Sequence, residues 1–217
     1  MDPLDLYADD NLVTAAAAYV KDYMSNYDAS HDWSHILRVL ALAHKIYNDP
    51  TTNTIAASKP ALSLRKITLA ALLHDVGDKK YLQPGQDHTR LVHDVLLERG
   101  APEALAVEIQ TICLGVSYSS EVKDPNAVVA LLARVPELAV VQDADRLDAI
   151  GAVGVGRCFT FGGAKGGGRG LQGAIDHFEE KLLRIEGMMK TEAGRRLAAE
   201  RTERLRVFEQ WWRDETA

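Results

Sequence analysis

Residues 64–78 read LRKITLAALLHDVGD, and this stretch decides the fold. Ser63 stands directly before it and has a side chain suited to capping a helix, while Gly77 near its end loosens or terminates one. The stretch between them is strongly apolar up to an adjacent His74 and Asp75. We therefore predict a buried helix whose C-terminal end carries an imidazole and a carboxylate.

Apolar residues recur at three- and four-residue spacings in several other segments, which is the pattern of amphipathic helices. No segment alternates strictly between apolar and polar residues between hairpin turns, so no sheet is expected. Residues 48–63 are rich in Asp, Pro, Thr, Asn and Ser and predict a loop. The predicted fold class is all-α, with helices at residues 12–26, 33–47, 64–76, 88–99, 102–116, 126–134, 137–150, 175–189 and 191–212.

The 217 residues suit one well-buried core, and we expect a single domain. Its core covers about residues 27–150. Residues 151–173 are too rich in glycine for a stable helix interior and predict a loop, or a short helix followed by a loop. C-terminal helices follow over residues 174–214.

Charge and cysteine content narrow the class of protein. A net charge of −6 and a pI near 5.6 argue against a broad basic face for nucleic acid or an anionic membrane, and favour a small ligand. Cys113 and Cys158 have no C-x-x-C spacing, so neither a disulfide framework nor a thiolate zinc site is expected. The acidic N-terminus and the lack of a long apolar run favour a cytoplasmic protein.

Three predicted helices each offer side chains of the type that bind metals. A lone His or Asp at a helix end is more often a cap or a satisfied buried residue. An adjacent His-Asp pair after an apolar helix is different, because a buried carboxylate beside an imidazole needs compensation and a cation supplies it most simply. The candidates are His31, His35 and Arg38, then His74 and Asp75, then Asp143, Asp145 and Asp148.

The order of these motifs resembles the HD superfamily of metal-dependent phosphohydrolases. H-x-x-R-V occurs at residues 35–39, HD at residues 74–75, and DADRLDAIG at residues 143–151. The longer blocks SHDWSHILRV, LLHDVGDKKY and DADRLDAIGAVGVGRCFTFGG are similar to small single-domain HD proteins related to nucleotide pyrophosphohydrolases. The likeness spans the chain from about Tyr27 to the C-terminal helices.

The resemblance implies a helical HD domain that binds one divalent ion through His35, His74, Asp75 and Asp145. Mn²⁺ is the expected ion, with Mg²⁺, Ni²⁺, Co²⁺ or Fe²⁺ as alternatives. HD proteins with two metals carry further histidines between the HD pair and the last Asp, where His93 is the weaker candidate for a second site. The implied reaction is hydrolysis of (deoxy)nucleoside triphosphates to a monophosphate and pyrophosphate by a metal-activated water.

Further roles are assigned by position. Asp78 follows Asp75 by three residues and is a candidate general base, or else a turn residue paired with a neighbouring lysine. His31 lies one turn before His35 and is a candidate for contacting a water or a phosphate, with a purely structural position as the alternative. The candidate phosphate contacts are Arg38, Lys79 and Lys80, together with Lys165 and Arg169 of the glycine-rich segment.

Other functions compete with this assignment. A 5′-nucleotidase or phosphodiesterase would use the same metal site, a non-catalytic nucleotide sensor would bind without turnover, and an iron-dependent oxygenase is a distant third. The expected partner is a small nucleotide, with neither nucleic acid nor membrane. Trp211 and Trp212 are expected to close the core or to contact a second copy in a homodimer.

Overall fold

The structure is a computed structural model that describes residues 3–217 apart from residues 29, 55–60, 79–81, 83–84 and 165–169. Over the described residues the chain forms helices and no strand, so the predicted all-α class is confirmed. With η for a 3-10 helix, the elements are η1 (Asp5–Tyr7), α1 (Asn11–Tyr23), η2 (Met24–Asn26), α2 (Trp33–Tyr47), α3 (Pro50–Thr54), α4 (Leu64–Leu73), α5 (Leu91–Glu98), α6 (Glu103–Val116), α7 (Tyr118–Lys123), α8 (Pro125–Arg134), α9 (Glu137–Asp148), α10 (Gly151–Ala164), α11 (Gly170–Glu180), η4 (Leu182–Met188) and α12 (Glu192–Thr216).

The apolar stretch that decides the fold forms α4, which lies inside the bundle. All side chains from Ile67 to Leu73 are buried, and α1, α2, α6 and α9 pack around them. Each fully buried Leu or Ile contributes about 1.5–3 kcal/mol to stability. Ser63 caps the helix by accepting a hydrogen bond from the Lys66 amide at 3.3 Å. The helix stops three residues before its predicted end, and Gly77, with φ +84°, turns the chain away.

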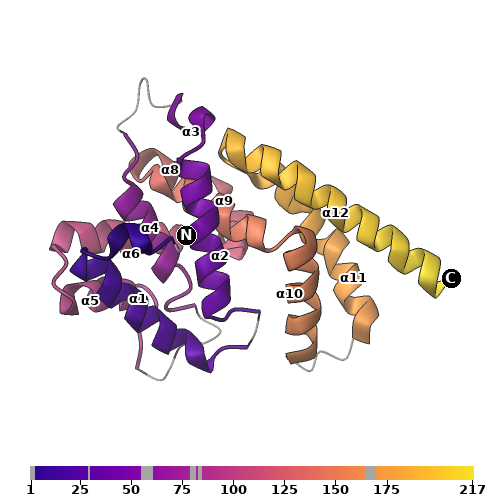
Figure 1. The fold of residues 1–217 in the computed structure, drawn as a ribbon, viewed down its shortest axis with the longest axis horizontal. Coiled ribbons are helices and arrows are strands. Elements are labelled where there is room, and N and C mark those ends of the chain that lie inside the picture. The colour runs from indigo at the N-terminus through magenta and orange to yellow at the C-terminus, as the bar shows by residue number, and fades with distance from the viewer. Residues whose placement is uncertain (1–2, 29, 55–60, 79–81, 83–84, 165–169) are drawn as a thin grey trace.

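Helices α2 and α9 lie side by side next to α4 (Figure 1). The inward side chains of α2 recur every three or four residues, and Ile36, Val39 and Leu40 have no exposed surface. Asp32 caps α2 by accepting a hydrogen bond from the His35 amide at 3.0 Å, which fixes the first turn of the helix. Three helices distant in sequence thus bring their polar ends to one place.

The loop prediction for residues 151–173 is wrong at both ends, because residues 151–164 form α10 and residues 170–173 begin α11. The alternative of a helix followed by a loop agrees better, although residues 165–169 lie outside the described part. Val155 and Phe159 pack against the core, and a Cβ on Gly154 would collide with the carbonyl of Ala149, so glycine permits this close packing. Such contacts outweigh a helix propensity about 1 kcal/mol worse than that of alanine.

Three other segments differ from the sequence-based prediction. The single helix expected at residues 175–189 is divided at Lys181 into α11 and η4. The short helices α3 and α7 form where no helix is expected. Their few residues carry too little periodic pattern for a helix to be predicted from sequence.

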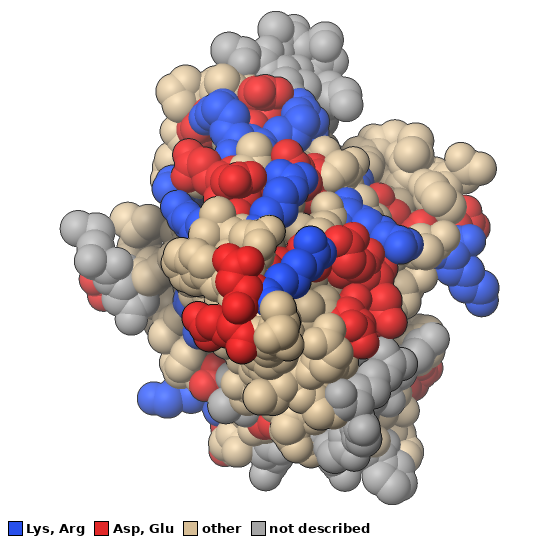
Figure 2. Space-filling model, turned by 90° about the vertical axis from the view of Figure 1, so that its right-hand side faces the viewer, with Lys and Arg blue, Asp and Glu red and all other residues tan. Residues whose placement is uncertain are grey.

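The C-terminal helices α11 and α12 lie on one side of the molecule, where basic and acidic side chains are intermingled (Figure 2). Ion pairs along α12 include Arg195 with Glu192 at 3.0 Å and Arg213 with Glu209 at 2.7 Å. Trp212 donates a hydrogen bond to Gln172 at 3.0 Å, whereas 60% of Trp211 is exposed. No helix among the described residues is both long and apolar enough to cross a bilayer.

Asp143 anchors the start of α12 to α9. Its buried carboxylate accepts hydrogen bonds from the Lys190 amide at 2.8 Å and from the amide and hydroxyl of Thr191, each at 2.7 Å. Thr191 in turn caps α12 by accepting from the Gly194 amide at 2.9 Å. Burial raises the pKa of Asp143. This aspartate therefore has a structural role, and it does not belong with the metal-binding candidates of α9.

Replacing Asp143 with alanine should lower the free energy of unfolding by about 2–4 kcal/mol, because two backbone amides and a hydroxyl lose their acceptor. Urea unfolding followed by circular dichroism measures this loss. Asp124→Ala is the matched control, since Asp124 is an exposed helix cap that accepts from the Ala127 amide at 3.0 Å; a loss of about 1 kcal/mol is expected there. Equal losses in the two variants would contradict the anchoring role.

Candidate metal centre

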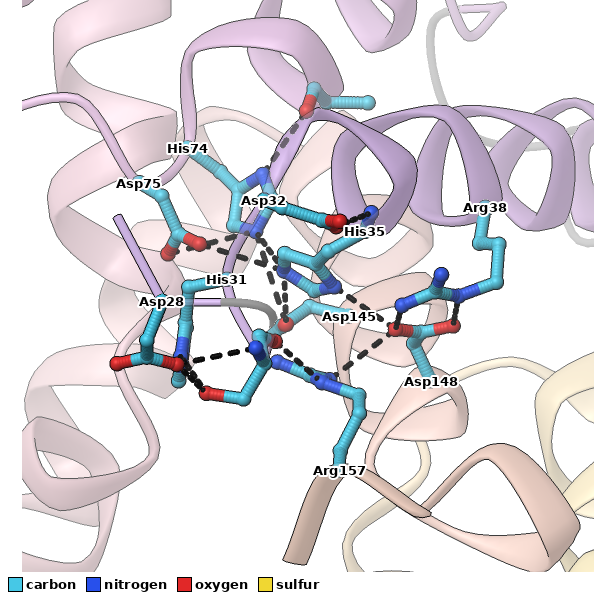
Figure 3. Close-up of polar contacts among 12 residues, drawn as sticks. Asp28, His31, Asp32, His35, Arg38, His74, Asp75, Asp145, Asp148 and Arg157 are labelled. Atoms are coloured by element: carbon cyan, nitrogen blue, oxygen red, sulfur yellow. Dashed lines mark hydrogen bonds and ion pairs between the residues drawn. The ribbon is translucent and has the colours of Figure 1, made fainter. Parts of the chain in front are cut away.

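Four side chains from α2, α9 and the turn after α4 converge at one point (Figure 3). His35 comes from the first turn of α2 and His74 is the C-cap of α4. Asp75 follows in the turn, and Asp145 projects from the last turns of α9. Both imidazoles are buried, whereas the Asp75 and Asp145 side chains are 17% and 27% exposed. The group is thus held rigidly on its histidine side and is accessible on its carboxylate side.

The spacing of His35, His74 and Asp75 is close to that of ligands around one cation, and Asp145 lies slightly farther out. The two histidine Nε2 atoms lie 3.2 Å apart. Asp75 approaches the His35 Nε2 to 3.3 Å and the His74 Nε2 to 3.5 Å, and Asp145 lies 3.7 and 3.6 Å from the same atoms. Ligands about 2.1 Å from a shared ion are about 3.0–3.4 Å apart in octahedral or tetrahedral geometry. His35, His74 and Asp75 by themselves have donor atoms within 4.8 Å of one another.

Hydrogen bonds determine which nitrogen of each imidazole carries the proton. The Nδ1 of His74 lies 2.8 Å from the carbonyl oxygen of Ala71, and a carbonyl can only accept, so this nitrogen is the donor. The Nδ1 of His35 lies 2.8 Å from the carboxylate of Asp148 and donates to it in the same way. When an imidazole carries only this Nδ1 proton, its Nε2 lone pair is therefore directed at the shared point.

Such a group requires a positive charge at its centre. Two lone pairs and two carboxylates face one another, and the buried Oδ2 of Asp75 accepts no hydrogen bond among the described residues. Unpaired buried charge of this kind is costly unless a cation or a proton offsets it. Two imidazoles and two carboxylates form a donor set that suits a borderline or hard divalent ion. The residues present therefore fit a divalent cation.

The pKa values of the cluster reflect the same crowding of negative charge. Burial lowers the pKa of His74, but Asp75 and Asp145 outweigh burial and raise it to about 9. Burial raises the pKa of Asp145, but His74 and His35 outweigh burial and lower it to about 2. The same two imidazoles hold the pKa of Asp75 well below its usual value. In the absence of a metal, a proton on His74 thus supplies part of the positive charge that a cation would provide.

Asp148 forms a second group of polar contacts behind His35, which the sequence-based interpretation missed. Arg38 donates to it through Nε at 2.8 Å and Nη2 at 3.1 Å, and Arg157 donates through Nη1 at 3.1 Å. Arg38, a candidate phosphate contact, uses Nε and Nη2 for this carboxylate while its side chain stays 35% exposed, so a phosphate contact stays a prediction. Asp148 follows Asp145 by three residues, so helical periodicity alone places both on one face. No local sequence signal identifies Arg157.

The candidate catalytic residues lie beside the cluster. The His31 ring is 5.8 Å from that of His35 and 6.0 Å from that of Phe161, and its Nδ1 is 2.7 Å from the Ser30 hydroxyl. Asp78 is partly buried in the turn after α4, where its amide donates to the carbonyl oxygen of Asp75 at 3.2 Å. The chemical roles of both residues stay predictions.

Other candidates lie outside the centre or outside the described part of the chain. Both ring nitrogens of His93 contact carboxylates, Asp94 at 2.7 Å and Glu103 at 2.9 Å, so this imidazole is not available for a second metal. Four of the five candidate phosphate contacts lie outside the described residues: Lys79, Lys80, Lys165 and Arg169.

Comparison with known proteins identifies the family. Residues 32–150, which include all four converging side chains, match the HD domain family. The uncharacterized protein YpgQ of Bacillus subtilis (strain 168) is 37% identical over 185 residues, or 84% of this chain and 83% of that protein.

Solved structures give the same result. The crystal structure of Bacillus subtilis YpgQ in complex with ADP has a TM-score of 0.68 and 34% identity, covering 92% of this chain and 97% of that one. A Lactobacillus plantarum protein has a TM-score of 0.75 and 27% identity, covering 95% and 97%. An HD-superfamily hydrolase from Bacillus thuringiensis has a TM-score of 0.66 and 28% identity, covering 94% and 95%. With its matching domain, relatives and helical architecture, the chain belongs to the HD superfamily and has the fold of its hydrolases.

Proposed function

We propose that this protein is a Mn²⁺-dependent phosphohydrolase that converts (deoxy)nucleoside triphosphates to monophosphates and pyrophosphate. The observation that carries the proposal is the convergence of the His35 and His74 lone pairs with the carboxylates of Asp75 and Asp145. The HD-superfamily fold supports metal-dependent phosphate chemistry. A nucleotide substrate is supported by the relative YpgQ, whose structure was solved with ADP.

The charge balance of the centre agrees with a polyanionic substrate only when a cation is present. Asp75, Asp145 and Asp148 contribute three carboxylates, against the guanidinium groups of Arg38 and Arg157. A bound divalent ion would reverse this excess of negative charge, lower the pKa of a water and polarise a phosphoryl oxygen. The protein side chains hold the donor atoms in place and leave positions for water and phosphate oxygens.

Asp78 and His31 are the residues that we assign to proton and phosphate handling. The proposal for Asp78 is supported by its backbone, which is tied to that of Asp75 across the Gly77 turn. In this role its carboxylate accepts a proton from the attacking water. His31 borders the same region and orients a phosphate oxygen or a water. Direct phosphate contacts are proposed for Arg38, Lys79, Lys80, Lys165 and Arg169.

Loss of a metal ligand should abolish both metal binding and hydrolysis while leaving the fold intact. For His35→Gln we expect a loss of Mn²⁺ affinity above about 100-fold, which exceeds the effect of removing an outer hydrogen-bond partner of a ligand. Isothermal titration calorimetry measures the affinity, and thermal melting verifies folding. His44→Gln is the matched control, because His44 is a buried imidazole on the same helix that contacts Thr68 at 2.8 Å. Equal Mn²⁺ affinities in the two variants would refute the proposed site.

The position of bond cleavage distinguishes the proposed reaction from its alternatives. With dATP and Mn²⁺ we expect dAMP and pyrophosphate, and Mg²⁺, Co²⁺, Ni²⁺ and Fe²⁺ should be assayed in parallel. Hydrolysis in H₂¹⁸O, followed by mass spectrometry, shows which phosphorus atom the water attacks. Release of orthophosphate from dAMP would indicate a nucleotidase, and cleavage of a diester a phosphodiesterase. Nucleotide binding without any product would indicate a sensor.

Asp78→Asn should slow hydrolysis by about 10²- to 10⁴-fold, which is the usual contribution of a general base. Its Mn²⁺ affinity should stay within a few-fold of the wild-type value, because Asp78 is not assigned as a ligand. Single-turnover kinetics at saturating Mn²⁺ and dATP measures the rate. Asp87→Asn provides a control, since Asp87 is an exposed turn residue that accepts from the Thr89 amide at 2.9 Å. A wild-type rate in Asp78→Asn with metal bound removes Asp78 from the mechanism.

A further inference from the structure

Asp148 lies next to His35, on the side away from the other three converging side chains. Its side chain is 1% exposed, yet it accepts four hydrogen bonds from three side chains. His35 donates through Nδ1 at 2.8 Å, Arg38 through Nε at 2.8 Å and Nη2 at 3.1 Å, and Arg157 through Nη1 at 3.1 Å. Such a fully satisfied buried carboxylate is rigid, and so is the imidazole bonded to it.

The two histidines of the centre are held in different ways. The Nδ1 of His74 donates to the backbone carbonyl of Ala71, which belongs to the same helix. The Nδ1 of His35 depends on the side chain of Asp148. An ionised carboxylate can only accept, so it keeps the His35 proton on Nδ1 and leaves the Nε2 lone pair for the ion. The orientation of His35 therefore rests on one replaceable residue.

Two arginines keep Asp148 charged and fixed in position. Arg38 lies one turn after His35 on α2, whereas Arg157 comes from α10 (Figure 3). Arg157 also donates through Nε to the carbonyl oxygen of Ser30 at 2.7 Å, in the segment that precedes α2. The glycine-rich helix α10 is thereby connected to both the entrance of α2 and the carboxylate behind His35.

We propose that Asp148 is a positioning residue of the metal centre, which sets the tautomer and orientation of His35 and is itself held by Arg38 and by Arg157 of α10. Asp148 contacts His35 and the two arginines, and it acts on the centre through His35. The inference rests on the metal site of the proposed function, but it does not depend on which nucleotide is hydrolysed.

The first test uses the wild-type protein loaded with diamagnetic Zn²⁺. Long-range ¹H–¹⁵N NMR correlation of labelled histidines should show His35 protonated on Nδ1 and coordinated through Nε2, with a downfield Nδ1 proton characteristic of a bond to a carboxylate. Detection of the proton on Nε2 would overturn the proposal. This measurement needs no substitution and no activity.

The second test compares two buried aspartates of α9. Asp148→Asn should lower Mn²⁺ affinity by about 10- to 100-fold, remove the downfield His35 proton signal, and retain most of kcat at saturating Mn²⁺. Asp143→Asn is the matched control, because Asp143 is equally buried but its partners are Lys190 and Thr191. It should lower the melting temperature with Mn²⁺ affinity unchanged. Equal Mn²⁺ affinities in the two variants would mean that Asp148 is merely structural, and would overturn the proposal.

Arg157→Gln extends the test to a residue at the edge of the core. One of the four hydrogen bonds to Asp148 is lost, and Arg38 still holds the carboxylate. We expect a loss of Mn²⁺ affinity of a few-fold, smaller than that of Asp148→Asn. An unchanged affinity would remove α10 from the proposal. If no nucleotide is hydrolysed by the wild-type protein although His35 shows the expected NMR signature, the proposed function fails while the role of Asp148 stands.

Discussion

The contact on which the centre depends is the 3.2 Å approach of the His35 and His74 Nε2 atoms. Because each Nδ1 donates a hydrogen bond, the facing nitrogens present lone pairs, and two carboxylates lie beside them. The arrangement is unfavourable without a bound cation or a proton on His74, and the helices around it hold the groups together. Burial of α2, α4 and α9 supplies that rigidity, as α4 is enclosed by four other helices. Helix packing thus holds together donor groups whose negative charge a bound ion would offset.

Much of this could be predicted from local sequence. The bounds of α4 could be predicted within a few residues from the cap at Ser63, the apolar run and Gly77. The adjacent His74 and Asp75 mark the end of the helix that carries candidate metal ligands. Helical geometry also separates the aspartates of α9, because residues two apart differ by about 200° around the axis whereas residues three apart share a face. Asp145 and Asp148 accordingly face the centre, while Asp143 faces α12.

The parts that sequence did not predict depend on contacts between distant residues. Glycine content argues against helix α10, but tertiary packing against α11 and α12 and the close approach at Gly154 outweigh that preference. Arg157 stands in this segment and reaches Ser30, 127 positions earlier in the chain. No periodicity or spacing rule connects residues so far apart, and a single sequence therefore cannot show that α10 belongs to the support of the metal centre.

The two imidazoles are supported in different ways. The carboxylate of Asp148 holds the His35 ring on the side away from the shared point, whereas a carbonyl of its own helix holds the His74 ring. Arg38 and Arg157 fix the same carboxylate in position. Because Arg157 belongs to α10, the support of His35 extends to a helix that contributes none of the four converging side chains. The glycine-rich helix thus helps to hold a metal ligand through two intervening side chains.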